Sequence, residues 1–118
     1  MSYNSNNIFA KILRGEISCK KVYENEHVLA FHDVNPQKNI HVLVIPKGEY
    51  IDLNDFNNKA SDKEIIELNK AITHVPSLLG AKDKGYRVLT NIGSDGGQEV
   101  PHLHFHIFAG EKIGKMVS

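Results

Sequence analysis

Three histidines at alternate positions near the end of the chain are the residues most able to do chemistry. They lie in segment 101–108, PHLHFHIF, where polar and apolar side chains alternate. Residues i, i+2 and i+4 of a strand lie on one face, so His102, His104 and His106 are predicted to point the same way. The apolar residues between them would face the core and hold the register of the strand.

Three imidazoles on one face fit two kinds of site. Histidines two residues apart, with a third ligand, can hold Zn²⁺, but no Cys pair, H-E-x-x-H motif or nearby carboxylate follows this segment. The alternative is transfer of a phosphoryl or acyl group, with imidazole as nucleophile and general acid. The preceding segment 93–99, GSDGGQE, favours transfer, because glycine lets backbone amides approach an anion closely.

Hydrophobic periodicity predicts the elements that position these residues. Residues 7–15 predict a short amphipathic helix, with Asn7 as N-cap and a glycine at its end. A capping box at Ser61 and Glu64 starts the main helix, which is predicted from about 62 to the mid-70s, where Pro76 ends or kinks it. The predicted strands are residues 21–24, 28–32, 40–45, 86–90 and 102–108.

Strands paired by hairpins with a helix laid across them give an α+β class. The length of 118 residues fits a single domain, 1–118, with short, poorly determined ends at about 1–5 and 111–118. Apolar residues make up 41% of the chain, enough to form one core that needs no disulfide or structural metal.

Charge and cysteine content narrow the function classes. Fourteen basic residues balance fourteen acidic ones, which argues against binding nucleic acid or anionic membranes. The single Cys19 cannot form an internal disulfide, and the chain has neither a run of about 20 apolar residues nor a signal-peptide pattern. We therefore expect a cytoplasmic protein.

The segment 97–108, GQEVPHLHFHIF, resembles the signature of the histidine triad (HIT) family, His-x-His-x-His followed by two apolar residues. Segments 7–17, 30–37, 40–47 and 85–89 also resemble its nucleotide-binding, Hint-like branch. The resemblance implies a HIT-like fold, a mainly antiparallel sheet of about five strands with a short N-terminal helix and one long helix packed across it. It also implies a homodimeric purine nucleoside phosphoramidase that needs neither a cofactor nor a metal.

Enzymes of that branch cleave adenosine 5′-phosphoramidates and acyl- or aminoacyl-adenylates to AMP. By resemblance, His104 is the nucleophile on the α-phosphorus and forms a nucleotidyl-histidine that water hydrolyses. His102 and His41 would orient His104 and manage the proton that the leaving amine needs. His106 would lie against the phosphate or ribose of an AMP- or GMP-type ligand.

The resemblance also implies the residues that bind substrate. Asp33 would accept the ribose hydroxyls, and it fits equally well as the cap of the turn before Pro36. The phosphate side would be formed by Asn91, Gly97, Gln98 and Glu99, with backbone amides offered by Gly97 and Glu99. The base would lie among apolar residues that periodicity alone assigns to the core: Ile8, Phe9, Ile12, Ile17, Phe31 and Val34.

Departures from the family pattern keep other functions open. Glu99 stands where other members carry Ser, Pro101 stands where Tyr is frequent, and Cys19 alone cannot replace the Cys-x-x-Cys zinc site of some relatives. The tail from residue 111 resembles no family ending, so leaving-group preference stays open. The alternatives are a dinucleoside polyphosphate hydrolase, a nucleotide-binding or scaffold protein with incidental turnover, and a metal-binding module.

Overall fold

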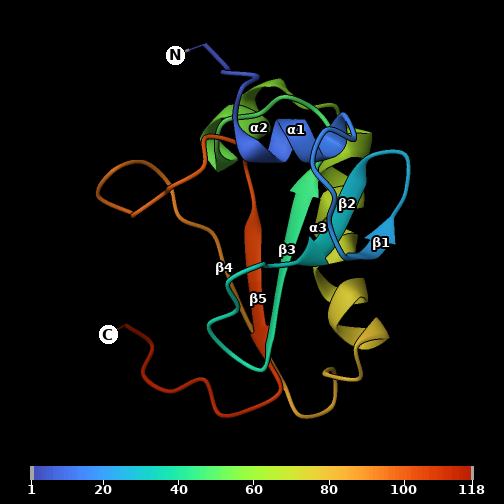
Figure 1. The fold of residues 1–118 in the computed structure, drawn as a ribbon, viewed down its shortest axis with the longest axis vertical. Coiled ribbons are helices and arrows are strands. Elements are labelled where there is room, and N and C mark those ends of the chain that lie inside the picture. The colour runs from blue at the N-terminus through green and yellow to red at the C-terminus, as the bar shows by residue number, and fades with distance from the viewer. Residues whose placement is uncertain (1, 118) are drawn as a thin grey trace.

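A five-stranded antiparallel sheet forms the centre of the molecule. The computed structural model describes residues 2–117, and of the ends predicted to be poorly determined only Met1 and Ser118 lie outside the described part. Strand order is β1-β2-β3-β5-β4 (Figure 1), which confirms the α+β class and puts β3 at the centre of the sheet. The strands are β1 (Lys21–Glu24), β2 (Val28–His32), β3 (Ile40–Pro46), β4 (Arg87–Leu89) and β5 (Phe105–Ala109).

Helix α3 (Asp62–Leu78) covers one face of the sheet. The predicted capping box is formed, because Ser61 and Glu64 each accept a hydrogen bond from the other's backbone N–H. The helix continues through Pro76 to Leu78, since a proline in the last turn removes only one backbone hydrogen bond. The core on this face consists of Val28, Ala30, Val42, Val44, Phe56, Leu68, Ala71, Val75, Leu103 and Ile107.

Helix α1 (Ile8–Leu13) covers the opposite face. Its start is set by Asn7, whose side chain accepts from the backbone N–H of Ala10. Phe9 packs edge to face on Phe31, with ring centroids 5.6 Å apart. The core on this face consists of Phe9 from α1, Leu29 and Phe31 from β2, and Leu43 and Ile45 from β3. Along both strands these residues alternate with those that face α3.

A further helix, α2 (Leu53–Lys59), was missed by the sequence analysis. Its segment, LNDFNNK, contains three asparagines, which have low helix propensity. The structure forms it because the side chain of Asp52 caps its N-terminus and Phe56 is buried in the core. Tertiary burial thus outweighs local propensity here.

The last strand is shorter than predicted. Residues 102–108 were expected to be extended throughout, but β5 begins at Phe105, and Leu103 donates its backbone N–H to the carbonyl of Tyr50 instead of to a strand. The alternation of sides is nevertheless retained, because Leu103 and Ile107 belong to the core that faces α3. Two of the three histidines therefore lie just before the strand.

No helix among residues 2–117 has the length and apolar character needed to cross a membrane.

Candidate active site

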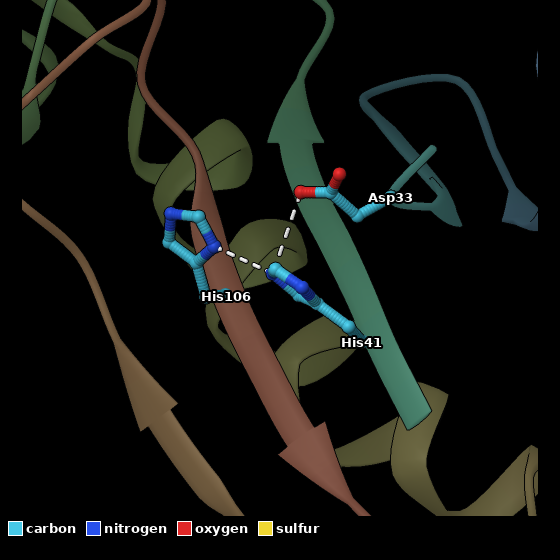
Figure 2. A group of neighbouring side chains, drawn as sticks. All are labelled: Asp33, His41 and His106. Atoms are coloured by element: carbon cyan, nitrogen blue, oxygen red, sulfur yellow. Dashed lines mark hydrogen bonds and ion pairs between the residues drawn. The ribbon is translucent and has the colours of Figure 1, made fainter. Parts of the chain in front are cut away.

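His41 and His106 lie on neighbouring strands and face the same side of the sheet. In the antiparallel pairing of β3 with β5, His106 is opposite Leu43 and His41 is opposite Phe108. The two histidines are therefore diagonal neighbours on one face. His41 Nε2 lies 2.9 Å from His106 Nδ1 (Figure 2), so the imidazoles are directly hydrogen-bonded.

Asp33 extends this pair into a chain of three side chains. Its Oδ2 lies 3.4 Å from His41 Nε2, and its Oδ1 caps the following turn by accepting the N–H of Asn35 at 2.9 Å. The backbone N–H of Gln37 donates to His41 Nδ1 at 3.1 Å. A nitrogen that accepts carries no proton, so neutral His41 is protonated on Nε2 and donates toward His106 Nδ1. His106 then carries its own proton on Nε2.

The same three side chains have the spacing of metal ligands. One ligand atom from each of Asp33, His41 and His106 lies within 4.8 Å of the others. Their protonation fits a cation poorly, because His41 Nε2 carries a proton while Gln37 donates to Nδ1. A metal on Nε2 would move that proton to Nδ1 and break the bond from Gln37. We therefore interpret the cluster as a hydrogen-bonded His41–His106 pair with the Asp33 carboxylate close to the same His41 nitrogen, and not as a metal site.

His104 is held by the backbone of His102. His104 Nδ1 lies 2.7 Å from the carbonyl oxygen of His102, so Nδ1 must carry the proton and donate. The lone pair of neutral His104 is consequently on Nε2. His102 itself donates from Nε2 to the carbonyl of Pro46 at 2.9 Å and accepts on Nδ1 from the hydroxyl of Tyr3 at 2.6 Å.

Burial keeps all four imidazoles neutral. Desolvation is the largest cause that lowers the pKa of His102 and of His106, each to about 4. It also lowers the pKa of His41, opposed by the charge of Asp33. The pKa of His104 is lowered by burial too, although the carbonyl of His102 and the nearby carboxylates oppose that effect. Near pH 7 the unprotonated forms therefore dominate.

A cavity of about 200 Å³, here called the histidine cavity, opens beside these imidazoles. Seven residues proposed from the sequence line it: Phe9, Asp33, Asn91, Gly97, Glu99, His104 and His106. The cavity therefore joins two imidazoles to carboxylate, amide and aromatic groups. His102 and His41 lie behind its wall, and each acts on a lining histidine, His102 on His104 and His41 on His106.

The glycine-rich loop contributes differently from what the sequence suggested. Gly97 was expected to offer its N–H to a phosphate, but that group donates to the carbonyl of Ser94 at 3.1 Å. Gly97 is needed instead for its backbone, with φ +80°, a conformation that L side chains rarely adopt. The amide side chain of Gln98 binds the loop to the carbonyls of Ile51 and Val100. Gln98 is thus a structural link in this arrangement.

The predicted base-binding residues are dispersed. Phe9 lines the histidine cavity, whereas Phe31 is 3% exposed in the core beneath α1 and Ile12 packs against that core. Ile8, Ile17 and Val34 are exposed, Val34 most of all at 84%. Their contact with a base stays a prediction.

Several residues of the site were missed from the sequence. Asn35, Gln37, Leu43 and Val100 also line the histidine cavity. Asn35, Leu43 and Val100 lie one or two positions from residues that were proposed and Gln37 lies three from Val34, so proximity along the chain was the available signal. Tyr3 had no such signal, because 99 positions separate it from His102.

These features define a fold with a histidine-lined site, and the comparison with known families agrees. The HIT domain model matches residues 14–113, and the chain belongs to the HIT family. An uncharacterized HIT-like protein of Azospirillum brasilense is 56% identical over 117 residues, covering 99% of this chain and 96% of the relative. One from Helicobacter pylori is 47% identical and covers 90% of this chain and 98% of its own.

Solved structures show the same fold. A HIT family hydrolase from Clostridium thermocellum superimposes with a TM-score of 0.88 at 36% identity, covering 98% of this chain and 99% of that one. A histidine triad protein from Clostridium difficile gives a TM-score of 0.84 at 44% identity, with 98% of each chain covered.

Proposed function

We propose that the protein is a hydrolase that cleaves purine nucleoside 5′-phosphoramidates and acyl- or aminoacyl-adenylates to the nucleoside monophosphate. One observation carries the proposal. His104 donates from Nδ1 to the carbonyl of His102, which leaves an unprotonated Nε2 on a residue that lines the histidine cavity. Membership of the HIT family and the similarity to a HIT family hydrolase support hydrolytic chemistry.

In the first step, His104 Nε2 attacks the α-phosphorus of the substrate. A bond from nitrogen to phosphorus forms while the bond from phosphorus to the leaving group breaks, and the leaving group departs with its electron pair. Positive charge develops on the imidazole during attack. The hydrogen bond from Nδ1 to the His102 carbonyl stabilises that charge where it appears.

The leaving amine needs a proton, and the geometry favours His106 as its source. Both ring nitrogens of His102 are already engaged, by Tyr3 and by the carbonyl of Pro46. His106 lines the cavity and carries a proton on Nε2, because its Nδ1 accepts from His41. Neutral His106 would become an imidazolate if it gave up that proton, so the donor is the imidazolium, formed by uptake of a second proton from solvent and stabilised by the negative charge of the bound nucleotide. The His41 Nε2–H then turns to Asp33 Oδ2, 3.4 Å away, because a protonated His106 Nδ1 no longer accepts.

In the second step, water attacks the phosphorus of the nucleotidyl-histidine. The nitrogen–phosphorus bond breaks, His104 Nε2 regains its lone pair, and the nucleoside monophosphate is released. One proton of the water passes to His106, which restores the proton lost in the first step.

Asp33 and the apolar residues supply the binding part of the proposal. A carboxylate can accept both ribose hydroxyls, and Asp33 keeps acceptor capacity beside its turn cap. Stacking of a purine near Phe9, with Ile8, Ile17 and Val34 as further contacts, would remove exposed apolar surface from water. Asn91 and Glu99 complete the phosphate side of the cavity.

A mass-spectrometric experiment tests the proposal. Purified protein is mixed with adenosine 5′-phosphoramidate without added metal, quenched during turnover and analysed intact and after digestion. We expect AMP as product and a protein species heavier by one AMP group, located on the peptide that contains His104. Turnover without any such species in rapidly quenched samples would reject the covalent mechanism, and absence of turnover would reject the activity.

A second candidate, hydrolysis of dinucleoside polyphosphates, is favoured by a neighbouring cavity of about 510 Å³. This basic cavity shares Gln37, Asn91 and His106 with the histidine cavity and is also lined by cationic residues that suit phosphates: Lys38, Arg87 and Lys115. Comparing kcat/KM for phosphoramidate, aminoacyl-adenylate and dinucleoside polyphosphate substrates separates the two functions.

The proposal includes a homodimer located in the cytoplasm. β4 forms one edge of the sheet, so the backbone groups on its outer side are open to pairing with a second copy, although its three residues offer only a short ladder. Multi-angle light scattering at micromolar concentration tests the association, and a monomeric mass would contradict it.

A further inference from the structure

The segment that carries His102 and His104 has few backbone anchors. β5 begins only at Phe105, so residues 101–104 lie outside the strand ladder, and Pro101 has no N–H to donate. Leu103 donates to the carbonyl of Tyr50, and the carbonyl of His104 accepts from the hydroxyl of Thr90. Two buried side chains also anchor this segment: Leu103 in the core that faces α3, and the completely buried His102 ring on the other side.

The His102 ring is held from both sides. Its Nε2–H donates to the carbonyl of Pro46 at 2.9 Å, so its Nδ1 must accept, and the acceptor is filled by the Tyr3 hydroxyl at 2.6 Å. The rings of Tyr3 and His102 also pack edge to face, with centroids 5.6 Å apart. Burial raises the pKa of Tyr3, which keeps the hydroxyl protonated and able to donate.

This anchor acts on His104 through the His102 carbonyl. The carbonyl accepts the Nδ1–H of His104 at 2.7 Å and so determines which nitrogen of His104 keeps its lone pair. Phe9 supports both rings, with centroids 6.3 Å from His102 and 4.9 Å from His104. If the buried His102 ring lost its hydrogen bonds, the backbone of residues 101–104 could shift, and with it the carbonyl that orients His104.

We propose that Tyr3 is a positioning residue for the nucleophile: its hydroxyl holds the orientation of the His102 ring, whose tautomer is set by the Pro46 carbonyl, and His102 in turn orients His104. The inference rests on the proposed function for its consequence in catalysis. Tyr3 is absent from the lining of the histidine cavity and therefore acts through His102 rather than on the substrate. Nothing in the sequence around Tyr3 predicts this role, because the contact spans 99 positions.

The substitution Tyr3→Phe tests the hydroxyl while it retains the ring. Without the hydroxyl, the buried Nδ1 of His102 loses its donor, and we expect the ring to populate more than one orientation, with a changed Nδ1 environment. Long-range ¹H–¹⁵N spectra of the histidine side chains report tautomers without substrate. In the wild type, they should show protonated Nε2 on His102 and protonated Nδ1 on His104, and in Tyr3→Phe the single His102 state should be lost.

Kinetics supply the second measurement. Because Tyr3 lies outside the cavity, kcat for the phosphoramidate should fall about tenfold, as for one lost hydrogen bond, while KM changes less than about twofold. Tyr23→Phe is the matched control, since it removes a phenolic hydroxyl whose partner is Asn25, and neither residue lines the histidine cavity. The control should retain both the spectrum and kcat.

The outcomes separate this inference from the proposed function. A wild-type His102 side-chain spectrum with wild-type kcat in Tyr3→Phe would overturn it, and so would a change in only one of the two. If the wild type hydrolyses no phosphoramidate, the proposed function fails, and the side-chain spectra of His102 and His104 in the two variants alone decide whether Tyr3 positions them.

Discussion

The two faces of the sheet differ in what they bury. The face under α3 packs aliphatic and aromatic side chains from the strands against the helix. The face under α1 also has an apolar core, but it contains the buried polar side chains found among residues 2–117, namely Asn7, His41, His102 and His104. Asn7 caps α1, and the three histidines are engaged in hydrogen bonds.

This difference shows how a small domain combines stability with chemistry. Apolar burial under α3 stabilises the fold and needs no specific partners. A buried imidazole is destabilising unless its nitrogens find donors and acceptors, so the α1 face must supply a partner for each. The same partners determine which ring nitrogen of each histidine carries the proton. The hydrogen bonds that a buried imidazole requires therefore also define which nitrogen can act as the nucleophile.

The largest effect should come from removing the nucleophile on the α1 face. His104→Ala should lower kcat for the phosphoramidate by at least about 10³-fold, because no other group replaces Nε2. AMP should still bind, which calorimetry measures. The exposed His74 on α3 offers the control His74→Ala, which should retain activity. Equal rates for wild type and His104→Ala would exclude His104 as nucleophile.

On the opposite face the largest effect should be on stability. Ile107 follows His106 but points into the core under α3 and is completely buried. Ile107→Ala should lower the free energy of unfolding by about 2–5 kcal/mol through lost apolar contacts and a cavity. Urea denaturation measures the change, and a loss below about 1 kcal/mol would contradict the assignment of this face to stability.

Acid should destabilise the protein through the α1 face. Folded His102 and His106 have pKa values of about 4, below the unfolded value of about 6.5. Between these values the unfolded chain binds protons that the folded chain does not. Stability is therefore fully present above about pH 6.5 and is lost as pH falls toward 4, by on the order of 3 kcal/mol for His102 alone.

Urea denaturation at several pH values between about 7 and 4.5 measures this loss. His106→Asn removes one of the responsible groups and should give a shallower dependence, whereas His74→Asn should follow the wild type. Stability that stays constant across the range would show that these imidazoles become protonated without cost.

The smallest effect should be on ligand affinity. Asp33→Ala should raise the Kd for AMP about tenfold, the effect of losing hydrogen bonds to a charged acceptor. Its loss of the turn cap on Asn35 should lower stability by only about 1 kcal/mol. Isothermal titration calorimetry measures the affinity, and an unchanged Kd would remove Asp33 from the ribose site.

Much of the fold followed from local patterns. Asn7 and the Ser61–Glu64 capping box marked two helix starts, and alternation placed Leu103 and Ile107 on the core side. Helix α2 was missed because its three asparagines have low helix propensity, whereas the helix is stabilised by the burial of Phe56, which local propensity does not report. β5 was predicted too long because alternation cannot tell a strand from an extended segment whose N–H groups bond elsewhere.

The site was predicted as a set of residues but not as an arrangement. His41 was expected to orient His104, whereas it is hydrogen-bonded to His106 across β3 and β5. Gly97 was expected to donate to a phosphate, but its N–H is used inside its own loop. In both cases residue type and approximate location were available from the sequence, and the hydrogen-bond partner was not.

The sequence by itself determined which residues could do chemistry and which side of the chain they occupy, because side-chain alternation and capping depend on neighbours a few positions apart. Tertiary structure decided which nitrogen of each imidazole carries the proton. That depends on Gln37, Pro46 and Tyr3, whose contacts with the histidines form only when the folded sheet and the N-terminal segment come together. The lone pair of His104 is set by the His102 carbonyl two positions away, but the hydrogen bonds that hold His102 join groups 56 and 99 positions apart, and such bonds leave no local pattern in a sequence.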